Sequence, residues 1–319
     1  MKGLTESTLD GWFKKTVELL KPLYEELKWE VFSCDYVQVD ETTVPVINRE
    51  KHKADKEYLW MVRSVMEKLV IFHYDGGSRA GAVIESLANH YHFKGYLQCD
   101  GFAGYETAFK ANPDVRLLNC LVHIRRHFEQ ALDENREMAQ HALTQIQHIY
   151  KIERQCDEAG LSYDERRQKR QELARPIMEA MKVWMETEGI KYSPGSLTGK
   201  AITYAYTKWD NIIRCLDDGR LYWDNNLAEN VQQPITLSRK NFLFCGNHEA
   251  AVNMSVICSL LATCKAHGVN PRVYLNDVIA QMPYHKKATQ EELLNLLPHK
   301  WKLKHPECVL TRQKEESCN

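Results

Sequence analysis

The sequence predicts an α/β fold in which three consecutive strands precede alternating helices and strands. Three observations predict it. Residues 36–74 contain three short apolar or alternating runs, residues 80–91 repeat apolar positions at helical spacing, and two further strand-like runs follow at 95–99 and 115–121. The resulting order is βββαβαβ. A chain of 319 residues, 44% hydrophobic and 27% charged, is long enough to bury one large core that carries an insertion.

The first half of the chain supplies the opening helix and the three strands. Residues 9–28 repeat apolar side chains at helical spacing, which predicts a helix. Residues 36–40 alternate apolar and polar side chains, residues 58–62 are aromatic and β-branched, and residues 69–74 form a short apolar run. The residues at 75–78, two glycines among them, then predict a turn and a helix start.

Beyond the strand at 95–99, which ends at Asp100, and the strand at 115–121, the pattern is helical and polar as far as residue 219. A short helix carrying Glu229 follows, and Pro234 is expected to end it. The remaining expected elements are a strand or extended loop at 239–244 and helices at 248–267, 271–280 and 290–297. The helix at 248–267 carries an apolar face expected to pack in the core: Ala251, Met254, Ile257, Cys258, Leu261 and Ala262.

The order of these elements is that of an RNase H-like fold, an α/β fold with a mixed sheet. Three consecutive strands make an antiparallel meander, and the helical crossovers add parallel strands on one side. In that fold the first and fourth strands are neighbours. We therefore expect an RNase H-like mixed sheet (βββαβαβ) with a helical insertion before the last catalytic helix. The expected segments are an N-terminal helical segment (1–30), the first part of the core (31–120), the insertion (121–219), the second part of the core (220–268) and a C-terminal helical segment and tail (269–319).

Composition limits where the protein works. Ten cysteines at irregular spacing fit reduced thiols, and neither an N-terminal leader nor an apolar run of membrane-spanning length is visible. These features predict a cytoplasmic protein without a membrane partner. The net charge of -1 is low for a nucleic-acid binder, so basic residues would have to act locally.

Three acids carry the expected chemistry. Asp40 lies at the first strand, Asp100 ends the fourth strand, and Glu229 lies in the helix after the insertion. In this fold the three carboxylates would meet at one site, where hard oxygen ligands suit two Mg²⁺ or Mn²⁺ ions. Two such ions can assist an in-line phosphoryl displacement without a covalent protein nucleophile. Asp35 competes with Asp40 as the first ligand, and Asp224 competes with Glu229 as the third.

Several separated stretches resemble the transposases of bacterial insertion sequence family 66, which are of the DDE type. The first acid lies in VDETTVPV, the second in GYLQCDGFAGY, and the third in DNNLAE, which runs into SRKNFLFCG. Supporting matches are SR after the third strand, CLVHIRRHF, and LLPHKW near the end. Together these motifs extend from about residue 36 to residue 301. The chain is identified as resembling the catalytic and C-terminal region of this family.

The resemblance implies a polynucleotidyl transferase and nuclease that cleaves DNA strands and transfers a 3′-hydroxyl during transposition of an insertion sequence. It favours Asp40, Asp100 and Glu229 as the catalytic and metal-binding residues. It also implies that the partners are DNA, at the transposon ends and the target, a homo-oligomer formed on DNA, and accessory proteins of the same element. The expected place of action is the bacterial nucleoid. The chain departs from the family at Asn230, where the family generally has an arginine.

Basic residues flank two of the acid-bearing segments. Arg125, Arg126, Arg239 and Lys240 are the candidates for DNA phosphate contacts, because arginine forms bidentate bonds with phosphate. The family motif further implies that His123 points toward the acids or the scissile phosphate. Nearby aromatic residues, Tyr222 and Trp223, either pack in the core or stack on an unpaired base.

Two Cys-x-x-His pairs have metal-ligand spacing. Cys120 with His123, and Cys264 with His267, would make a four-ligand zinc site only if the fold brought them together. The other interpretation places Cys120 in the fifth strand as a packed thiol beside a functional His123.

Two other functions remain open at the level of sequence. One is an inactive or domesticated transposase fragment that binds DNA. The other is a different RNase H-like nuclease, which would cleave DNA without joining a 3′-hydroxyl to a target. Metal-dependent cleavage of defined ends, and strand transfer, distinguish the three functions.

Overall fold

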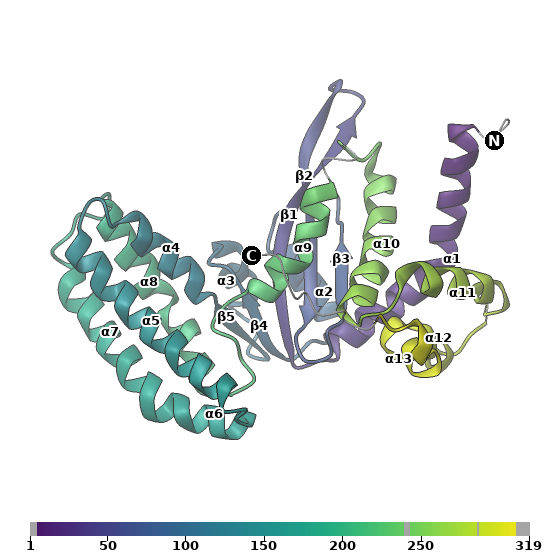
Figure 1. Cartoon of the computed structure of the whole chain (residues 1–319). Helices are drawn as coiled ribbons and strands as arrows, with labels where there is room; N and C mark the ends of the chain where they lie inside the picture. Colours follow the sequence, from purple (N-terminus) through teal and green to yellow (C-terminus); the bar gives the residue numbers. More distant parts are fainter. Residues whose placement is uncertain (1–4, 239–242, 286, 311–319) are drawn as a thin grey trace, which may run out of the picture. The chain divides into compact units, whose positions relative to one another are not determined.

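The computed structural model describes residues 5–238, 243–285 and 287–310 (Figure 1). The chain forms two compact units. Met1–Gly95 and Leu227–Asn319 make up the first unit, and Tyr96–Asn226 makes up the second. Asp40 and Glu229 therefore belong to the first unit, whereas Asp100 belongs to the second.

Five strands form one sheet in the order β3-β2-β1-β4-β5. Their bounds are β1 (Tyr36–Asn48), β2 (Lys53–Ser64), β3 (Val70–His73), β4 (Gly95–Cys99) and β5 (Val115–Asn119). The pairs β1–β2 and β2–β3 are antiparallel, and Asp40 lies opposite Met61. The α/β class and the order βββαβαβ confirm the prediction. β1 extends further than predicted because Thr42, Val44 and Val46 continue its buried face.

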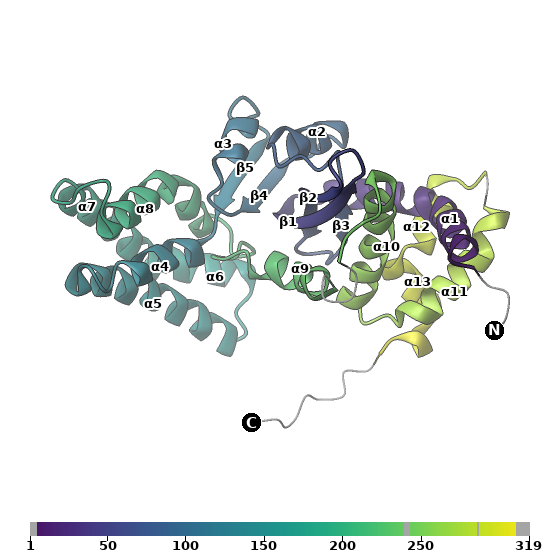
Figure 2. The ribbon, with the colours of Figure 1, turned by 90° about the horizontal axis from the view of Figure 1, so that it is seen from above.

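The first unit contains most of the helices that surround β1, β2 and β3. They are α1 (Glu6–Phe32), α2 (Ala82–His90), α9 (Asn226–Ser238), α10 (His248–Ala266), α11 (Pro271–Gln281), α12 (Gln290–Leu296) and α13 (Pro298–Lys304), with the 3-10 turns η3 (Met282–Tyr284) and η4 (Pro306–Cys308). The last helices, α11, α12 and α13, gather beside α1 (Figure 2). The sequence predicted the helices that became α11 and α12 but not α13.

α10 covers the outer edge of β3. The backbone N–H of Phe72 donates to Ser259 Oγ (2.8 Å), and that of Val70 donates to Thr263 Oγ1 (3.1 Å). Hydroxyls four residues apart on a helix thus satisfy a strand edge that would otherwise be open for pairing with another chain. The predicted apolar face of this helix is only partly correct. Ala251 is buried, but the most buried face includes Ser255, Ser259 and Thr263.

One face of β1 meets α9. The even-numbered residues of β1 share that face, because side chains alternate along a strand. Val44 and Val46 belong to a buried cluster that also contains Ala228 and Ile235 of α9. β2, β3 and α10 complete the cluster with Leu59, Met61, Val70, Phe72 and Ala251. Apolar packing therefore holds α9 against the strand that carries Asp40.

The second unit consists largely of helices. They are α3 (Ala103–Phe109), α4 (Leu121–Gln130), α5 (Arg136–Glu158), α6 (Tyr163–Lys169), α7 (Arg175–Gly189) and α8 (Leu197–Ile213), with the π-helical turn η1 (Arg170–Ala174) and the 3-10 turn η2 (Arg214–Leu216). α4, α5, α7 and α8 pack as a bundle (Figure 1). Its interior is filled by apolar residues such as Ile146, Met178, Met181 and Trp209. The helical character predicted for this stretch is confirmed.

Two local predictions are wrong. α9 runs to Ser238, so Pro234 lies inside the helix and does not end it. A proline removes one backbone donor, and the packing of Ile235 in the core holds the helix together beyond it. Cys120 is not in the fifth strand: β5 ends at Asn119, and Cys120 occupies the N-cap position of α4.

Among the helices of the described residues, none is both long enough and apolar enough to cross a lipid bilayer.

Candidate functional site

Asp40 lies in the middle of β1, on the face that packs against α9. Its side chain is partly buried, and Oδ1 accepts a hydrogen bond from the backbone N–H of Glu41 (2.9 Å). The Glu41 side chain points to the opposite face, where Arg79 binds it through Nε and Nη2, both at 2.9 Å. The SR motif after β3 therefore supplies a cation for the neighbour of Asp40.

Glu229 lies in the first turn of α9, and a side chain of β1 fixes the position of that turn. The Gln38 amide is buried, and its Oε1 accepts a hydrogen bond from the backbone N–H of Ala228 (3.1 Å). Gln38 precedes Asp40 by two residues on the same face of β1, and Ala228 directly precedes Glu229. The first unit thus brings together the segments that carry Asp40 and Glu229.

Asp100 follows β4 in the second unit and is held by polar neighbours. Its carboxylate Oδ1 accepts from the backbone N–H of Phe102 (2.9 Å), which closes a tight turn. Its backbone carbonyl accepts from Asn119 Nδ2 (2.7 Å), and Asn119 Oδ1 in turn accepts from Asn211 Nδ2 of α8 (2.9 Å). The conformation at Asp100 therefore depends on β5 and α8.

Tyr204, also on α8, lies against the turn beside Asp100. A Cβ atom built at Gly101 would stand 2.0 Å from the Tyr204 hydroxyl, so only glycine allows this approach. Burial, with the charge of Asp100 as the next cause, raises the pKa of Tyr204 above its ordinary value. The centres of the Tyr204 and His127 rings are 4.2 Å apart. The sequence did not point to Tyr204, although the glycine after Asp100 was a signal of close approach.

α4 carries Arg125 and Arg126, which the sequence predicted as contacts to DNA phosphates. Arg125 and Arg126 are exposed, and Arg125 Nε forms an ion pair with Glu129 (3.3 Å). His123 is partly buried on the same helix and stands near enough to His127 to contribute, after burial, to lowering the pKa of His127. Arg239 and Lys240, the other predicted phosphate contacts, lie outside the described residues.

The Cys120 thiol acts as a local acceptor. Its Sγ accepts from the backbone N–H of Asn225 (3.3 Å), and burial raises its pKa to about 11. A protonated, buried thiol is a poor metal ligand. Cys264 is buried in α10, and His267 follows that helix as its C-cap.

The competing acids differ in setting. Asp35 is exposed and precedes β1. Asp224 Oδ1 accepts from the backbone N–H of Asn226 (3.1 Å), at the start of α9. Trp223 is 2% exposed and bonded within the protein, so it packs in the core and does not serve as a base-stacking platform. Tyr222 is 47% exposed.

The metal hypothesis rests on the chemistry of the donor set. Three carboxylates with hard oxygen atoms are the ligands that Mg²⁺ and Mn²⁺ prefer. Within the part of the chain that the structure describes, no group of three or more His, Cys, Asp or Glu side chains is gathered for a metal ion. The donors therefore fit a divalent cation in type, whereas a ready-made cluster is not present among the described residues.

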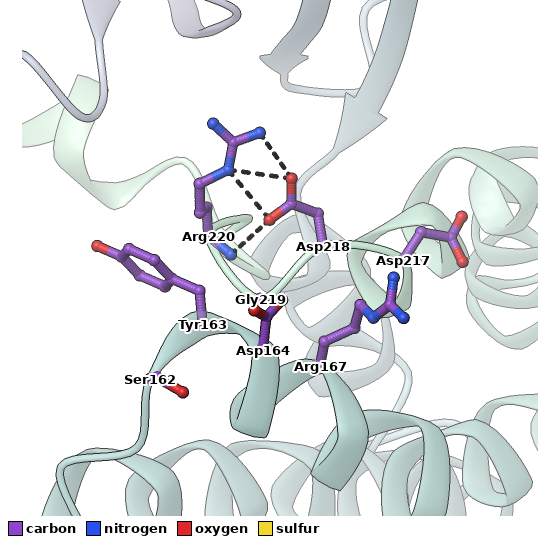
Figure 3. Close-up of a pocket in the computed structure, with 8 residues that line it drawn as sticks. All are labelled: Ser162, Tyr163, Asp164, Arg167, Asp217, Asp218, Gly219 and Arg220. Carbon is purple, nitrogen blue, oxygen red and sulfur yellow. Dashed lines mark hydrogen bonds and ion pairs between the residues drawn. The ribbon is translucent and has the colours of Figure 1, made fainter.

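A separate pocket in the second unit does not resemble an active site (Figure 3). It has a volume of about 470 Å³, and its lining consists of Ser162, Tyr163, Asp164, Arg167, Asp217, Asp218, Gly219 and Arg220. Arg220 is bound through Nη2 to Asp218 (2.7 Å), so its charge is already neutralised. Two arginines face three aspartates here, which disfavours an anionic ligand such as DNA.

Comparison with known proteins gives matches along most of the chain. Residues 3–253 match the family model described as "Transposase IS66 family", and residues 259–299 match the "IS66 C-terminal element". Among similar proteins are two uncharacterized proteins of Sinorhizobium fredii (strain NBRC 101917 / NGR234). The protein y4hP is 27% identical over 94% of this chain and 56% of its own length. The protein y4jD is 29% identical over 94% of this chain and 60% of its own length. The chain thus spans a little over half the length of these relatives.

Proposed function

Because the chain belongs to the IS66 family of transposases, we propose that it is the catalytic region of a DDE transposase with an RNase H-like core. The proposed reaction is metal-dependent cleavage of DNA strands at the ends of an insertion sequence, followed by transfer of a 3′-hydroxyl to target DNA. The main support for the proposal is the hydrogen bond from the backbone N–H of Ala228 to Gln38 Oε1. It joins two segments 190 residues apart in the sequence, each of which bears a predicted catalytic acid.

The position proposed for Asp100 is supported by a contact at the start of β4. A Cβ atom at Gly95 would stand 2.1 Å from the carbonyl oxygen of Asp35, so the two backbones approach closely there. Asp40 follows Asp35 by five residues, and Asp100 follows Gly95 by five residues. The proposal that Asp100 joins Asp40 at one site rests on the RNase H-like fold, in which the first and fourth strands are neighbours.

In this proposal Asp40, Asp100 and Glu229 hold two Mg²⁺ or Mn²⁺ ions. Bound divalent cations lower the pKa of an attacking water or 3′-hydroxyl and stabilise the charge on a leaving oxygen. Arg125, Arg126, Arg239 and Lys240 hold backbone phosphates and fix the register of the DNA without reading its sequence. His123 lies on the same helix as the two arginines and would face the scissile phosphate.

The partners and place of action follow from the same proposal. They are DNA at the ends and at the target, further copies of the chain on that DNA, and accessory proteins encoded by the same element. Action on chromosomal DNA places the protein at the bacterial nucleoid.

The test is strand cleavage and joining on DNA that carries the terminal sequences of the element, with Mg²⁺ or Mn²⁺. Wild-type protein should yield nicked ends and joined products. Asp100→Asn should abolish both, because it removes a charge from the ion site, while binding of the same DNA stays within about twofold. Asp35→Asn is the matched control and should leave cleavage intact.

Other outcomes select other functions. DNA binding without cleavage by the wild type would identify a fragment that binds but does not catalyse. Cleavage without joining would identify another RNase H-like nuclease. Retained cleavage in Asp100→Asn would remove Asp100 from the mechanism.

A further inference from the structure

A chain of hydrogen bonds in the second unit leads from a cation to the peptide group that follows Asp100. Arg214 Nη1 donates to Asn211 Oδ1 (2.7 Å), and Asn211 Nδ2 donates to Asn119 Oδ1 (2.9 Å). Asn119 Nδ2 then donates to the carbonyl oxygen of Asp100 (2.7 Å). All four residues belong to Tyr96–Asn226, so these bonds lie within one compact unit. We call Arg214, Asn211 and Asn119 the relay.

The two ends of the relay fix the direction of every bond in it. A guanidinium can only donate hydrogen bonds, and a backbone carbonyl can only accept them. A side-chain amide can turn over and exchange its oxygen with its nitrogen, but here each amide has to present its oxygen on the side of Arg214 and its nitrogen on the side of Asp100. The bonds therefore all point the same way, and aligned hydrogen bonds strengthen one another.

Burial raises the free-energy cost of losing these bonds. Asn119 is 3% exposed, and Asn211 and Arg214 are partly buried. Arg214 Nη1 also donates to the carbonyl of Leu117 in β5 (2.7 Å), which holds the guanidinium in place. If Asn119 lost one partner, a polar atom would be left unsatisfied away from water. The relay therefore favours a single arrangement.

The carbonyl that accepts from the relay belongs to the turn that orients the Asp100 carboxylate. Oδ1 of that carboxylate accepts from the backbone N–H of Phe102 (2.9 Å). The carbonyl of Asp100 and the N–H of Phe102 lie on either side of Gly101 in the ring that this bond closes. Because peptide groups are planar, a fixed carbonyl fixes the backbone torsion ψ of Asp100, and with it the position of the N–H that holds the carboxylate.

Other side chains of α8 hold the same turn. Tyr204, Lys208 and Asn211 are spaced by four and three residues, so they share one face of this helix. Tyr204 closely approaches Gly101. Lys208, whose side chain is 8% exposed, pairs with Glu106 of α3 (2.7 Å), the helix that directly follows the turn. One face of α8 is therefore directed at the turn that bears the second acid.

We infer that Arg214, Asn211 and Asn119 are positioning residues for Asp100. They set the peptide group that follows the acid and, through it, the direction of the metal-binding carboxylate. The inference rests on the proposed function, in which Asp100 holds a divalent cation. Asn211 and Arg214 lie in the stretch predicted as the helical insertion, so the insertion gains a part in placing the second acid that needs no contact with the reacting atoms.

Asn211→Asp is the most direct test, because it keeps the size of the side chain and its bond to Arg214 but replaces the donor that faces Asn119 with an acceptor. The Asn119 amide must then turn its nitrogen toward the new carboxylate, which sets its oxygen against the Asp100 carbonyl. The first readout is the ¹³C resonance of the Asp100 carbonyl in the full chain, which should move upfield as the accepted hydrogen bond is lost. The second is the affinity of the full chain for Mn²⁺, measured by electron paramagnetic resonance. It should weaken by about fivefold or more, the effect of one lost hydrogen bond of ordinary strength.

Asn135→Asp is the matched control. It adds the same charge to the same unit. Asn135 is the N-cap of α5, where its Oδ1 accepts from the backbone N–H of Met138 (3.2 Å), and aspartate caps a helix as well as asparagine does. Neither the Asp100 resonance nor the Mn²⁺ affinity should change.

The outcomes separate this inference from the proposed function. An unmoved Asp100 resonance, or an unchanged Mn²⁺ affinity, in Asn211→Asp overturns the positioning role and leaves the transposase proposal intact. Both changes, in a chain whose wild type binds Mn²⁺ but cleaves no DNA, support the positioning role and refute the enzymatic proposal. A wild type that binds no Mn²⁺ refutes both.

If Asn211→Asp does not fold, two variants of Arg214 take its place with the same readouts. Lysine can only donate, so Arg214→Lys should keep the Asp100 resonance in place and the Mn²⁺ affinity within about twofold of wild type. Glutamine can accept as well as donate, so Arg214→Gln leaves the direction of the relay unfixed and should change both. Equal results for the two variants would overturn the inference.

Discussion

Neutral side chains determine the geometry around Asp100. Asn119 holds its carbonyl oxygen, and the ring of Tyr204 closes the space beside Gly101. None of these residues would attract notice in a search for charged catalytic groups. Their effect is to fix the direction in which the carboxylate leaves β4, and pre-organised carboxylates bind ions without further ordering.

Gly101→Ala tests this close approach. The new Cβ would stand 2.0 Å from the Tyr204 hydroxyl and 2.6 Å from its Cζ, so the turn or the ring must move. We expect a loss of about 1–3 kcal/mol in the free energy of unfolding, as for other overpacked sites. Chemical denaturation of the single variant measures it. In a Tyr204→Ala background the same substitution should cost much less, which a double-mutant cycle detects.

Gly246→Ala is the control for that experiment. No atom lies within 4 Å of a Cβ at Gly246, so its substitution should leave stability within about 0.5 kcal/mol. Equal costs for Gly101→Ala with and without Tyr204 would show that the tyrosine is not what constrains the turn.

The role of a residue was easier to predict from the sequence where a regular pattern marked its position. β4 was placed correctly at 95–99, and the acid after it could be named, because strand periodicity and a following glycine mark that end. Gln38 and Tyr204 were missed, since a polar residue in a strand and a tyrosine in a helix have no distinctive spacing. Their roles depend on contacts with Ala228 and Gly101, which are remote in the sequence.

The predictions for the end of α9 and for the buried face of α10 failed for the same reason. Pro234 was expected to end α9, and an apolar face of α10 was expected to pack in the core, because local propensity favours both. In the structure, tertiary contacts decide. α9 continues through packing at Ile235, and the hydroxyls of Ser259 and Thr263 are buried because they bond to the edge of β3.

Glu153 of α5 and Arg170 of η1 form a buried ion pair, in which Arg170 Nε lies 2.7 Å from Glu153 Oε1. Arg170→Met leaves the Glu153 charge, 12% exposed, without its main partner, and we expect a loss of about 3 kcal/mol in unfolding free energy. Replacing both residues, Glu153→Met with Arg170→Met, removes the charge as well and should be less destabilising than the single change. Urea denaturation of the three proteins measures the difference.

A surface arginine in the neighbouring helix serves as control. Arg175 forms ion pairs at 3.5 and 3.6 Å with Glu179 and Asp217, and its side chain is 35% exposed. Arg175→Met should therefore change stability by less than about 1 kcal/mol. A double methionine variant less stable than Arg170→Met would show that the ion pair itself stabilises the bundle.

Two partly buried histidines, His267 and His299, make the stability of the folded chain depend on pH. Burial, aided by nearby lysine charges, lowers the pKa of His267 and of His299 to about 4, from 6.5. Glu30 lies 3.8 Å from His299, beyond hydrogen-bonding distance, and burial raises the pKa of Glu30 itself. The folded state therefore binds fewer protons than the unfolded state between pH 6.5 and 4. The contribution of the two histidines to stability should be fully present above pH 6.5, and it should fall as the pH decreases through this window.

Thermal unfolding at pH 7 and pH 5 measures this dependence. Each histidine contributes up to about 3 kcal/mol across the window. The His267→Gln and His299→Gln double variant should lose less melting temperature between the two pH values than the wild type does. The exposed His52 is the matched control, and His52→Gln should leave the slope unchanged. Identical slopes for the double variant and the wild type would mean that other groups dominate acid unfolding.

The net charge of the whole chain is -1, so DNA affinity has to come from a few local cations rather than from a general attraction. Arg239 and Lys240 follow the segment that bears Glu229, which makes them the cations most directly linked to the proposed site. If each neutralises one phosphate, replacing both with alanine should flatten the slope of log affinity against log salt by about two units on duplex DNA. The loss should be similar for any DNA sequence, because phosphate contacts position the duplex and do not read it. Lys51→Ala with Lys53→Ala removes the same charge from two exposed lysines, one in the turn after β1 and one at the first position of β2, and should leave the slope unchanged. If both pairs flatten the slope equally, binding depends on total charge, and Arg239 and Lys240 have no special place at the DNA.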